Sequence, residues 1–481
     1  MSPLAIVVLP AVAGLVISAR ATRAAPHILV AAAFVDAALA VNMGGIASER
    51  ALGAGASWRY VTLDATARLF LVLINVIFFG IAAYVWNRVR TVPKVREGLA
   101  RFSMLALVFM AAANAVVISN HILVMWLGLE ATTMCAAPLI IRLGVPASRR
   151  ASWTYFVFSS VGLSLALLGF MCLARSLEIN GHEPTFFLNE LAPLVSGPPN
   201  IWRRLGLALV FLGYGTKLGL APMYSWLPET YDQAPPAVTA MLASVQFNCA
   251  LVCLLRVLQV YRAGNHDLVA TDLVVVGLAS MAVSTFSIIA TRNLKRLLAY
   301  ASINHAGVIA IGLVVDNRMA SYGLLLYVVS NAFIKAILFL TAGKIKAYYG
   351  TKDTREIAGL IKDLPYSGMF LMVGTFALLG FPPFGSFLGE LMIFSGLIRS
   401  GQISVFVAFG VLITMTFVAT GRTIFPMIWG EPKRVVSWPA QTFGAAVPKL
   451  VFFVALVAMG IYLPPTVNAL FRQVAATLGR E

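Results

Sequence analysis

The sequence predicts an all-α membrane protein with about fourteen transmembrane helices. Only 11% of its 481 residues are charged, whereas soluble proteins carry about 25% charged residues. Hydrophobic residues make up 60% of the chain, and the mean hydropathy is +0.87. Apolar runs of roughly 18 or more residues recur from end to end, and each can cross a ~30 Å hydrocarbon core as a helix. Because the runs are long and do not alternate polar with apolar residues, helices are expected rather than a barrel.

The expected helices form a single polytopic domain, 1–481, with four parts. Helices 1–3 (3–19, 26–44 and 66–87) belong to the N-terminal part, 1–101. Helices 4–8 (102–118, 122–141, 152–174, 204–223 and 237–262) form a first five-helix block, 102–262. Helices 9–13 (270–290, 297–315, 320–342, 366–398 and 404–427) form a second block, 270–427. Helix 14 (448–467) precedes a short amphipathic tail within 448–481, and no loop is long enough for a soluble domain.

Loop charge predicts the orientation of the chain in the membrane. The net charge of +17 arises because Lys and Arg concentrate in loops on one side, as the positive-inside rule describes. The loops that follow odd-numbered helices hold Arg88, Arg90, Lys94, Arg96, Arg101, Arg142, Arg149, Arg150, Arg292, Lys295, Arg296, Lys344, Lys346, Lys352, Arg355 and Lys362. We therefore expect these loops in the cytoplasm of a bacterial-type cell, the chain in the inner membrane, and both termini on the non-cytoplasmic side. The apolar N-terminus is expected to be the first helix rather than a signal peptide.

Prolines interrupt two of the expected helices. Pro222 follows Lys217 by just over one turn in helix 7, and Pro382 and Pro383 precede Glu390 by two turns in helix 12. Proline removes a backbone donor and clashes with the preceding turn, so helices break there. Each break falls in the fourth helix of a five-helix block. Matching breaks in two halves are typical of inverted-repeat transporters with an ion path near the midplane, although prolines can also simply kink packed helices.

Five ionisable side chains lie well inside expected helices: Glu130 in helix 5, Lys217 in helix 7, His305 in helix 10, Lys335 in helix 11 and Glu390 in helix 12. A charge at mid-bilayer costs about 2.5–3.5 kcal/mol on insertion scales, so such residues usually face water or a partner. Burial disfavours the charged form, and a nearby opposite charge restores it. We therefore hypothesise that Glu130 tunes Lys217 and that the other three carry protons onward through water. Structural ion pairs and snorkelling stems are the alternatives.

Further polar residues allow more than one interpretation. Glu229 and Asp232 follow the break in helix 7 and could join the relay or be solvated in a loop. Gln246 and Asn248 in helix 8 could orient water or bond a neighbouring helix. Asp64, at the start of helix 3, is expected to cap that helix or form a structural pair. Arg422 lies nearer a helix end and could snorkel.

No metal or redox centre is expected in this chain. Cys135, Cys172, Cys249 and Cys253 all fall in expected helices, and the five histidines are scattered. The one-turn spacing of Cys249 and Cys253 lacks a third ligand nearby. The sequence contains no CxxC cluster, GxGxxG loop or haem motif. Any flavin, nickel or iron–sulfur chemistry must therefore belong to partner subunits, and the chain is not expected to be catalytic by itself.

Four blocks of sequence resemble a known family of ion-translocating membrane subunits. GYGTKLGLAPMYSWLPETYDQAPPAVTAML resembles the signature of the antiporter-like subunits (L, M and N) of respiratory complex I, Mrp antiporters and group 4 membrane-bound hydrogenases. TRNLKRLLAYASINHAGVIAIGL, NAFIKAILFLTAGKI and GFPPFGSFLGELMIF resemble three further family blocks in the expected order. The TKLGLAPMYSWLPETYDQAP segment looks most similar to the F-type subunit of hydrogenase-4 and formate hydrogenlyase-like complexes.

The resemblance implies fourteen helices in two inverted five-helix repeats, helices 4–8 and 9–13. It also implies that Glu130 and Lys217 match the coupled acid–lysine pair of the family, while His305, Lys335 and Glu390 match the ionisable positions of helices 10, 11 and 12. Partners are then other membrane subunits and a peripheral redox module, whose iron–sulfur clusters and nickel–iron site or other redox centres drive proton movement.

The sequence departs from the family at helix 8, where members often carry a Lys or His and this chain has Gln246, Asn248 and Arg256. Tyr224 and Asn331 replace two further common histidines, and the long lateral helix of the L-type subunit is not expected.

The sequence therefore predicts a proton-translocating subunit of a membrane-bound hydrogenase or formate hydrogenlyase-type complex. A complex I subunit or an Mrp-type Na⁺/H⁺ antiporter subunit remains an alternative. So do the energising partner of an inorganic-carbon or solute uptake complex, and a membrane anchor with a closed channel.

Overall fold

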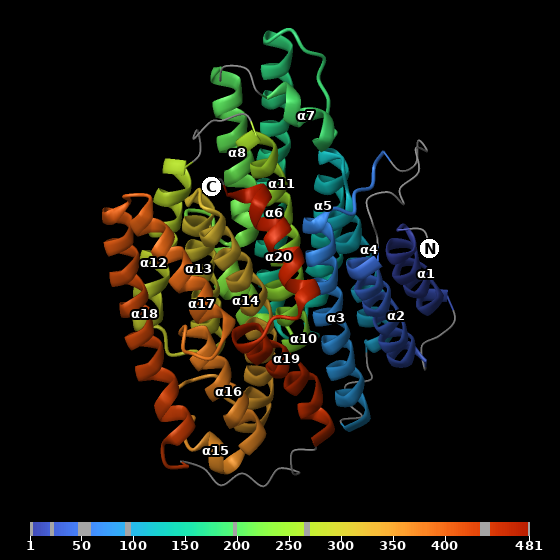
Figure 1. Ribbon diagram of the computed structural model, residues 1–481. Coiled ribbons are helices and arrows are strands. Elements are labelled where there is room, and N and C mark those ends of the chain that lie inside the picture. Colours follow the sequence, from blue (N-terminus) through green and yellow to red (C-terminus); the bar gives the residue numbers. More distant parts are fainter. Residues whose placement is uncertain are drawn as a thin grey trace.

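The computed structural model describes residues 3–19, 24–46, 59–91, 98–195, 200–263, 270–432 and 443–479. These residues form helices, with three isolated bridges as the only strand-like pairing among them. Figure 1 shows the helices running mostly along one direction, as in a membrane-embedded bundle. The expected all-α class is confirmed for the described part of the chain.

The helices follow the expected order along the chain. The first half contains α1 (Ala5–Ala19), α2 (Ala25–Ile46), α3 (Ala65–Thr91), α4 (Leu99–Ile118), α5 (Ile122–Ile140), α6 (Pro146–Ile179), α7 (Leu188–Leu194), α8 (Ile201–Leu218), α9 (Trp226–Gln233), α10 (Pro236–Ala240), the π-helix η4 (Met241–Gln246) and α11 (Phe247–Ala263). The second half contains α12 (Ala270–Ala290), α13 (Leu294–Val314), α14 (Arg318–Tyr349), α15 (Leu360–Asp363), α16 (Pro365–Leu378), α17 (Gly385–Arg399), α18 (Ile403–Trp429), α19 (Phe443–Ile461) and α20 (Pro465–Leu478).

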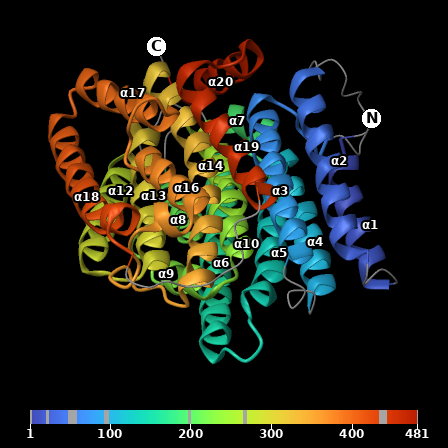
Figure 2. The same cartoon turned by 90° about the horizontal axis from the view of Figure 1, so that it is seen from below.

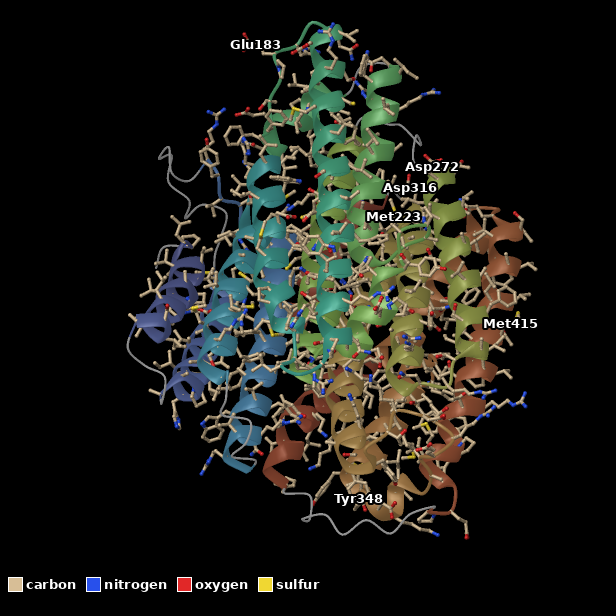
Figure 3. The ribbon with its side chains drawn as sticks, turned by 180° about the vertical axis from the view of Figure 1, so that it is seen from behind. Glu183, Met223, Asp272, Asp316, Tyr348 and Met415 are labelled. Atoms are coloured by element: carbon tan, nitrogen blue, oxygen red, sulfur yellow. The ribbon has the colours of Figure 1, made fainter. Side chains whose placement is uncertain are left out.

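Many of these helices are suited to crossing a membrane. Ten helices of the described chain are long and apolar enough to do so, and eleven are if α19 and α20, bent by 68°, form one broken span. Figure 3 shows that Glu183, Asp272 and Asp316 lie towards one end of the molecule and Tyr348 lies at the other. The chain is therefore a multi-pass membrane protein, whereas the number of fourteen crossings stays a prediction.

Several expected boundaries were wrong for identifiable reasons. The expected 152–174 and 320–342 are the longer helices α6 and α14, which continue past the apolar stretch because polar residues also support helix outside the hydrocarbon. By contrast, the expected 366–398 is interrupted at Pro382 and Pro383 as predicted, and its two parts are α16 and α17. The expected 448–467 ends at Ile461, because Pro464 and Pro465 start a new helix, α20.

The centre of the bundle is formed by α14 and by the continuous helix α10–η4–α11. The apolar windows of both are completely buried within the chain. Figures 1 and 2 agree that α1 and α2 lie at one edge of the molecule and α12 and α18 at the other. The helix α20 packs against the central helices, where Tyr322 donates to Asn468 at 3.0 Å and Gln259 donates to Thr477 at 2.9 Å.

Glycines allow two pairs of helices to approach closely. A Cβ atom added at Gly213 of α8 would lie 2.5 Å from the carbonyl oxygen of Gly162 of α6. A Cβ atom added at Gly389 of α17 would lie 2.6 Å from the carbonyl oxygen of Gly323 of α14. Membrane helices associate through such small-residue contacts because lipid supplies little hydrophobic drive between them. Both broken helices are thereby held against a long unbroken neighbour.

Asp64 both caps α3 and forms an ion pair, as expected. Its Oδ1 accepts a hydrogen bond from Ala67 N at 2.9 Å, and Arg256 of α11 donates to both carboxylate oxygens. Burial opposes ionisation of Asp64, but the Arg256 guanidinium holds the pKa of this carboxyl below its usual value of 3.8. The pair ties the N-terminal helices to the centre of the bundle.

We predict that Asp64→Asn lowers the thermal unfolding midpoint of the purified full chain. Because the Asp64 side chain is 38% exposed, solvent screening limits the loss to about 1–2 kcal/mol. With the folded-state pKa depressed, the contribution of the wild-type residue is complete above the unfolded value of about 4 and is lost as the pH falls through the folded value. The wild-type advantage should therefore disappear in acid, and Asp272→Asn at an exposed acid should change little. An equal effect of both variants at neutral pH would contradict this.

Candidate functional site

The first helix break leaves polar backbone groups in the middle of the bundle. The helix α8 ends at Leu218, Gly219 has a positive φ of 77°, and α9 begins at Trp226. Trp226 Nε1 donates to the carbonyl oxygen of Thr216 at 2.9 Å, and the amide of Ala221 donates to Ser280 Oγ at 2.8 Å. Side chains thus form hydrogen bonds with the backbone groups that the interruption frees. Pro222 lies between the two helices.

The second break has a similar form. The helix α16 ends at Leu378 and α17 begins at Gly385, with Pro382 and Pro383 between them. Gly380 adopts a φ of 67°, and Ser386 Oγ donates to the carbonyl oxygen of Ala377 at 2.7 Å. The Ala221–Pro222 and Pro382–Pro383 peptide bonds are both cis.

Lys217 is buried one residue before the end of α8. Its side chain is 3% exposed, its Nζ donates to Thr133 Oγ1 of α5 at 2.5 Å, and the same atom lies 5.1 Å from the ring centre of Tyr155 of α6. A hydroxyl and an aromatic face both favour an ammonium group at this position. Among the described residues, no carboxylate oxygen lies within 4.0 Å of Lys217 Nζ.

Glu130 of α5 was expected to act on Lys217, but it does not form an ion pair with it. One oxygen accepts a hydrogen bond from Ser160 of α6 at 2.7 Å, and the other, although buried, has no hydrogen-bond partner among the described residues. Thr133, one helical turn after Glu130 on α5, is the residue that binds Lys217. Glu130 and the hydroxyl that binds Lys217 therefore lie along one face of α5, and no ion pair joins the acid to the lysine.

The π-helix η4 connects the Lys217 region to the second half of the chain. Gln246 accepts a hydrogen bond from Tyr155 at 2.9 Å and donates to Thr132 at 2.9 Å, so it bonds the helices on either side of Lys217. The next residue, Phe247, presents its ring to Lys335, whose Nζ lies 3.6 Å from the ring centre. π-Helical segments are rare and occur frequently at functional sites. Two consecutive residues of the central helix thus contact the surroundings of both buried lysines.

One face of α14 carries the polar residues of the second half. Tyr327, Asn331 and Lys335 are spaced by four residues and therefore lie along one side of the helix. Tyr327 forms a hydrogen bond with His305 of α13. All four side chains are at most 4% exposed. Tyr327 thus links His305 to the face of α14 that carries Asn331 and Lys335, whereas the role of these residues in a relay stays a prediction.

A small cavity adjoins His305 and reaches Glu390. It has a volume of about 20 Å³ and is lined by His305, Asn304, Glu390, Thr416 and Thr420 together with apolar residues. A space of this size holds about one water molecule. Asn304 donates to Ser284 and to Thr416, both at 3.1 Å, so hydroxyl and amide groups continue beyond the cavity towards α12 and α18.

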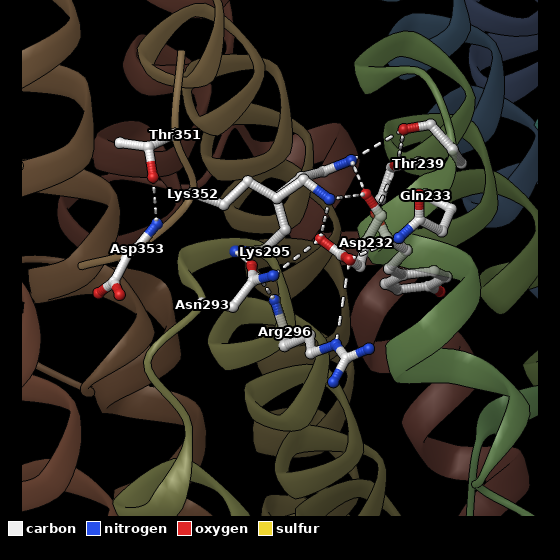
Figure 4. Close-up of polar contacts among 11 residues, drawn as sticks. Asp232, Gln233, Thr239, Asn293, Lys295, Arg296, Thr351, Lys352 and Asp353 are labelled. Atoms are coloured by element: carbon white, nitrogen blue, oxygen red, sulfur yellow. Dashed lines mark hydrogen bonds and ion pairs between the residues drawn. The ribbon is translucent and has the colours of Figure 1, made fainter. Parts of the chain in front are cut away.

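Asp232 is buried at the centre of a charged cluster. Its side chain is 4% exposed and accepts hydrogen bonds from Lys352 at 2.7 Å and Asn293 at 3.1 Å, with Arg296 4.0 Å away. Lys295 donates to the carbonyl oxygens of Asp232 at 3.2 Å and of Ala234 at 2.8 Å, at the C-terminal end of α9 (Figure 4). The cluster fixes the second half of the first broken helix to α13 and to the segment after α14.

The sequence does not reveal the burial of this cluster. It allowed Asp232 to be solvated, but the structure buries it, because α13 and the segment after α14 fold over the loop. Glu229 is a third exposed and lies 4.0 Å from Arg150, so for this residue the solvated alternative describes its position better. Lys295 and Lys352 were regarded only as loop charges. Nothing in the sequence shows that a loop charge will be covered by a distant segment.

One buried acid was missed altogether. Asp36 of α2 is fully buried, and neither of its carboxylate oxygens has a hydrogen-bond partner among the described residues. The signal that identified the other acids, a charge inside an apolar run, is also present here. Across the residues that the structure describes, no three His, Cys, Asp or Glu side chains gather where they could hold a metal ion.

The chain is similar to several known proteins. A family model described as "NADH:quinone oxidoreductase/Mrp antiporter, TM" matches residues 119–416. The hydrogenase-4 component F homolog of Methylacidiphilum infernorum is 31% identical over 376 residues, covering 76% of each chain. The NADH-quinone oxidoreductase subunit N of Desulforudis audaxviator is 28% identical over 457 residues, covering 89% of each chain.

A solved structure shows the same fold. A chain of the archaeal membrane-bound sulfane sulfur reductase (MBS), described as a respiratory membrane complex, superposes with a TM-score of 0.87 at 20% identity. The match covers 99% of this chain and 97% of the other. At this level of identity the likeness concerns the fold alone.

We predict that Asp232→Ala destabilises the full chain. The substitution leaves the partly buried Lys352 without its carboxylate, which costs roughly 3 kcal/mol when one partner of a buried pair is removed. Thermal unfolding of the purified protein should therefore begin at a clearly lower temperature. Glu229→Ala, which removes a neighbouring acid with a weak 4.0 Å contact, is the matched control and should cost less than about 1 kcal/mol. Similar losses of stability in the two variants would show that the buried cluster contributes no more to stability than an exposed ion pair.

Proposed function

Because this chain belongs to the NADH:quinone oxidoreductase/Mrp antiporter transmembrane family, we propose that it moves protons across the membrane through its buried polar residues. The observation that carries this proposal is that one central helix connects the surroundings of two buried lysines. Lys217 faces the ring of Tyr155, which donates to Gln246, and Lys335 faces the ring of the next residue, Phe247. Ionisable groups inside membrane proteins are costly and mark ion or proton pathways.

In the first half of the proposed path, Glu130 and Lys217 exchange a proton through the hydroxyl groups around them. Ser160 holds one Glu130 oxygen, and Thr133 holds the lysine. From there Tyr155, hydrogen-bonded to Gln246 at 2.9 Å, leads to the π-helix η4. Gln246 cannot carry a charge, so its role is to orient donors and acceptors for a proton that passes beside it.

In the second half, the proton passes from Lys335 along α14 to Glu390. Asn331 lies one turn from Lys335, and Tyr327, one turn further, bonds His305. His305 lines the small cavity that Glu390 also lines. Glu390 is the final group, placed beside the second helix break, where Gly380 lies against its carboxylate.

Buried polar atoms without protein partners support a hydrated path. Among the described residues, five such groups lie on the central helix and on α14: Ser244 Oγ, Asn248 Oδ1, Ser330 Oγ, both amide atoms of Asn331 and Lys335 Nζ. Buried polar groups in native proteins are bonded to protein or to ordered water. We infer that water bonds these atoms and connects Lys217 to Lys335. This water would compensate for the absence of a Lys or His in the central helix α10–η4–α11.

We further propose fourteen crossings arranged in two inverted five-helix repeats, 102–262 and 270–427. Support comes from the matching breaks α8–α9 and α16–α17, each in the fourth helix of its block. It also comes from the matching glycine contacts, α6 with α8 and α14 with α17, since each pairs the third helix of a block with its broken fourth helix. Inverted repeats place ion sites near the membrane midplane at such breaks.

The proposed setting is a redox-driven complex of the membrane-bound hydrogenase or formate hydrogenlyase type in a bacterial inner membrane, with both termini outside the cytoplasm. The match to a hydrogenase-4 component F homolog, 31% identical over 376 residues, supports this setting; an equally identical NADH-quinone oxidoreductase subunit N matches over 298 residues. The partners would be other membrane subunits and a peripheral module that holds the iron–sulfur and nickel–iron centres. The chain itself would bind neither.

We predict that Lys217→Ala abolishes proton translocation by the intact complex. Removing a proton-transferring group should lower the rate at least about 100-fold. The measurement is acidification of sealed vesicles containing the purified complex, driven by its own redox reaction. Lys449→Ala removes an equally buried lysine of α19, which faces the ring of Phe370 and is not part of the proposed path, and should leave pumping intact. Undiminished pumping by Lys217→Ala would refute the proposal.

We predict that Gln246→Leu, which removes both hydrogen bonds at the junction, slows translocation about tenfold or more while the protein still folds. Gln246→His restores polar groups at the same position and should retain most of the rate. The comparison uses the same vesicle assay, with thermal unfolding as the check on folding. Equal translocation rates for Gln246→Leu and Gln246→His would show that protons do not pass beside this residue.

A further inference from the structure

A large cleft lies away from the proposed proton path, on the outer side of the second half. Its volume is about 1160 Å³, beyond the ~300–1,000 Å³ of most small-molecule sites. It is bounded by the end of α12, by α18, and by the segment 354–358 that follows α14. Met415, which lines it, lies at the outer edge of the molecule in Figure 3.

The walls of the cleft are apolar and face outward. Ile289 and Val418 are both 58% exposed. Only 17% of the apolar window of α18 is buried within the chain. Exposed aliphatic side chains at membrane depth contact acyl chains or another membrane protein.

Three arginines line the same cleft: Arg292, Arg355 and Arg422, against a single acid, Glu431. The first two are brought together because Thr354 donates to the carbonyl oxygen of Arg292 through its amide at 2.8 Å and its hydroxyl at 3.2 Å. Neither Arg292 nor Arg422 lies within 4.0 Å of a carboxylate in the described part of the chain. The cleft therefore has an excess of positive charge.

Arg422 lies deeper than a membrane-surface arginine would. It precedes the exposed Trp429, at the end of α18, by seven residues, which is about 10 Å along a helix. Tryptophan is typical of the membrane–water interface. A guanidinium below that level requires an anionic partner or must bend its side chain back towards the interface.

We propose that the cleft binds an anionic glycerophospholipid, with Arg292 and Arg422 holding its phosphate and α12 and α18 contacting its acyl chains. Guanidinium groups bind phosphate through paired hydrogen bonds, and basic pockets between membrane helices on the positively charged side bind lipid headgroups. A helix of a neighbouring subunit would cover the apolar walls but would need its own acidic side chains in the membrane to compensate the positive charge, whereas a lipid phosphate supplies that charge at the headgroup. The site is independent of the proton path.

The test compares the purified full chain in nanodiscs of phosphatidylglycerol and of phosphatidylcholine. The wild type should unfold at a higher temperature in phosphatidylglycerol and should retain this lipid in native mass spectrometry after extraction. The double variant Arg292→Gln/Arg422→Gln should retain about tenfold less and lose the lipid-specific shift. Arg101→Gln/Arg399→Gln makes the same charge change at two exposed arginines elsewhere and should behave as the wild type.

Several outcomes would overturn the proposal. Equal stabilisation by the two lipids, or equal retention by the two double variants, would exclude a phosphate site in the cleft. The same stabilisation by inorganic phosphate without phosphatidylglycerol would assign the arginines to a free anion. A cysteine at Val418 that cross-links to another subunit of the complex in native membranes, with no lipid retained, would assign the cleft to a protein interface.

Discussion

The cost of placing charge inside a membrane governs this structure. A lysine or glutamate at the centre of the bilayer is stable only if hydroxyl groups, aromatic rings or water replace its hydration. Lys217 has a threonine and a tyrosine ring, and Lys335 has a phenylalanine ring. These contacts favour the ammonium form without locking it in an ion pair. A lysine held in this way can gain or lose a proton, whereas a tight pair would resist the change.

The helix breaks follow from the same constraint. Backbone groups freed in the middle of a membrane protein must find partners within the protein. Thr216, Ala221 and Ala377 find them in the side chains of Trp226, Ser280 and Ser386. The interrupted helices can then end beside Lys217 and Glu390 without exposing backbone to lipid. The Asp232 cluster holds α9 in place after the first break, so the irregular segment is bounded by fixed elements on both sides.

The central helix α10–η4–α11 connects the surroundings of the two buried lysines. Its extra π turn belongs to the first block, yet Phe247 contacts a lysine of the second. The sequence suggested a gap at this helix, because it offers no Lys or His there. The structure instead shows a glutamine bonded to α5 and α6, and buried polar atoms on α14 that need water. In the proposed path, this polar, uncharged junction passes protons between the two lysines.

Hydropathy and proline positions determined the class of the protein, the order of the helices, both breaks and the position of the five ionisable residues within helices, because these properties depend on the local composition of each segment. The partners of those residues were decided by tertiary packing alone. Glu130 bonds Ser160 rather than Lys217, Asp232 is buried by segments more than sixty residues away, and Arg292 meets Arg422 in one cleft. Such contacts depend on how helices rotate and lean against one another, which periodicity along a single chain does not specify.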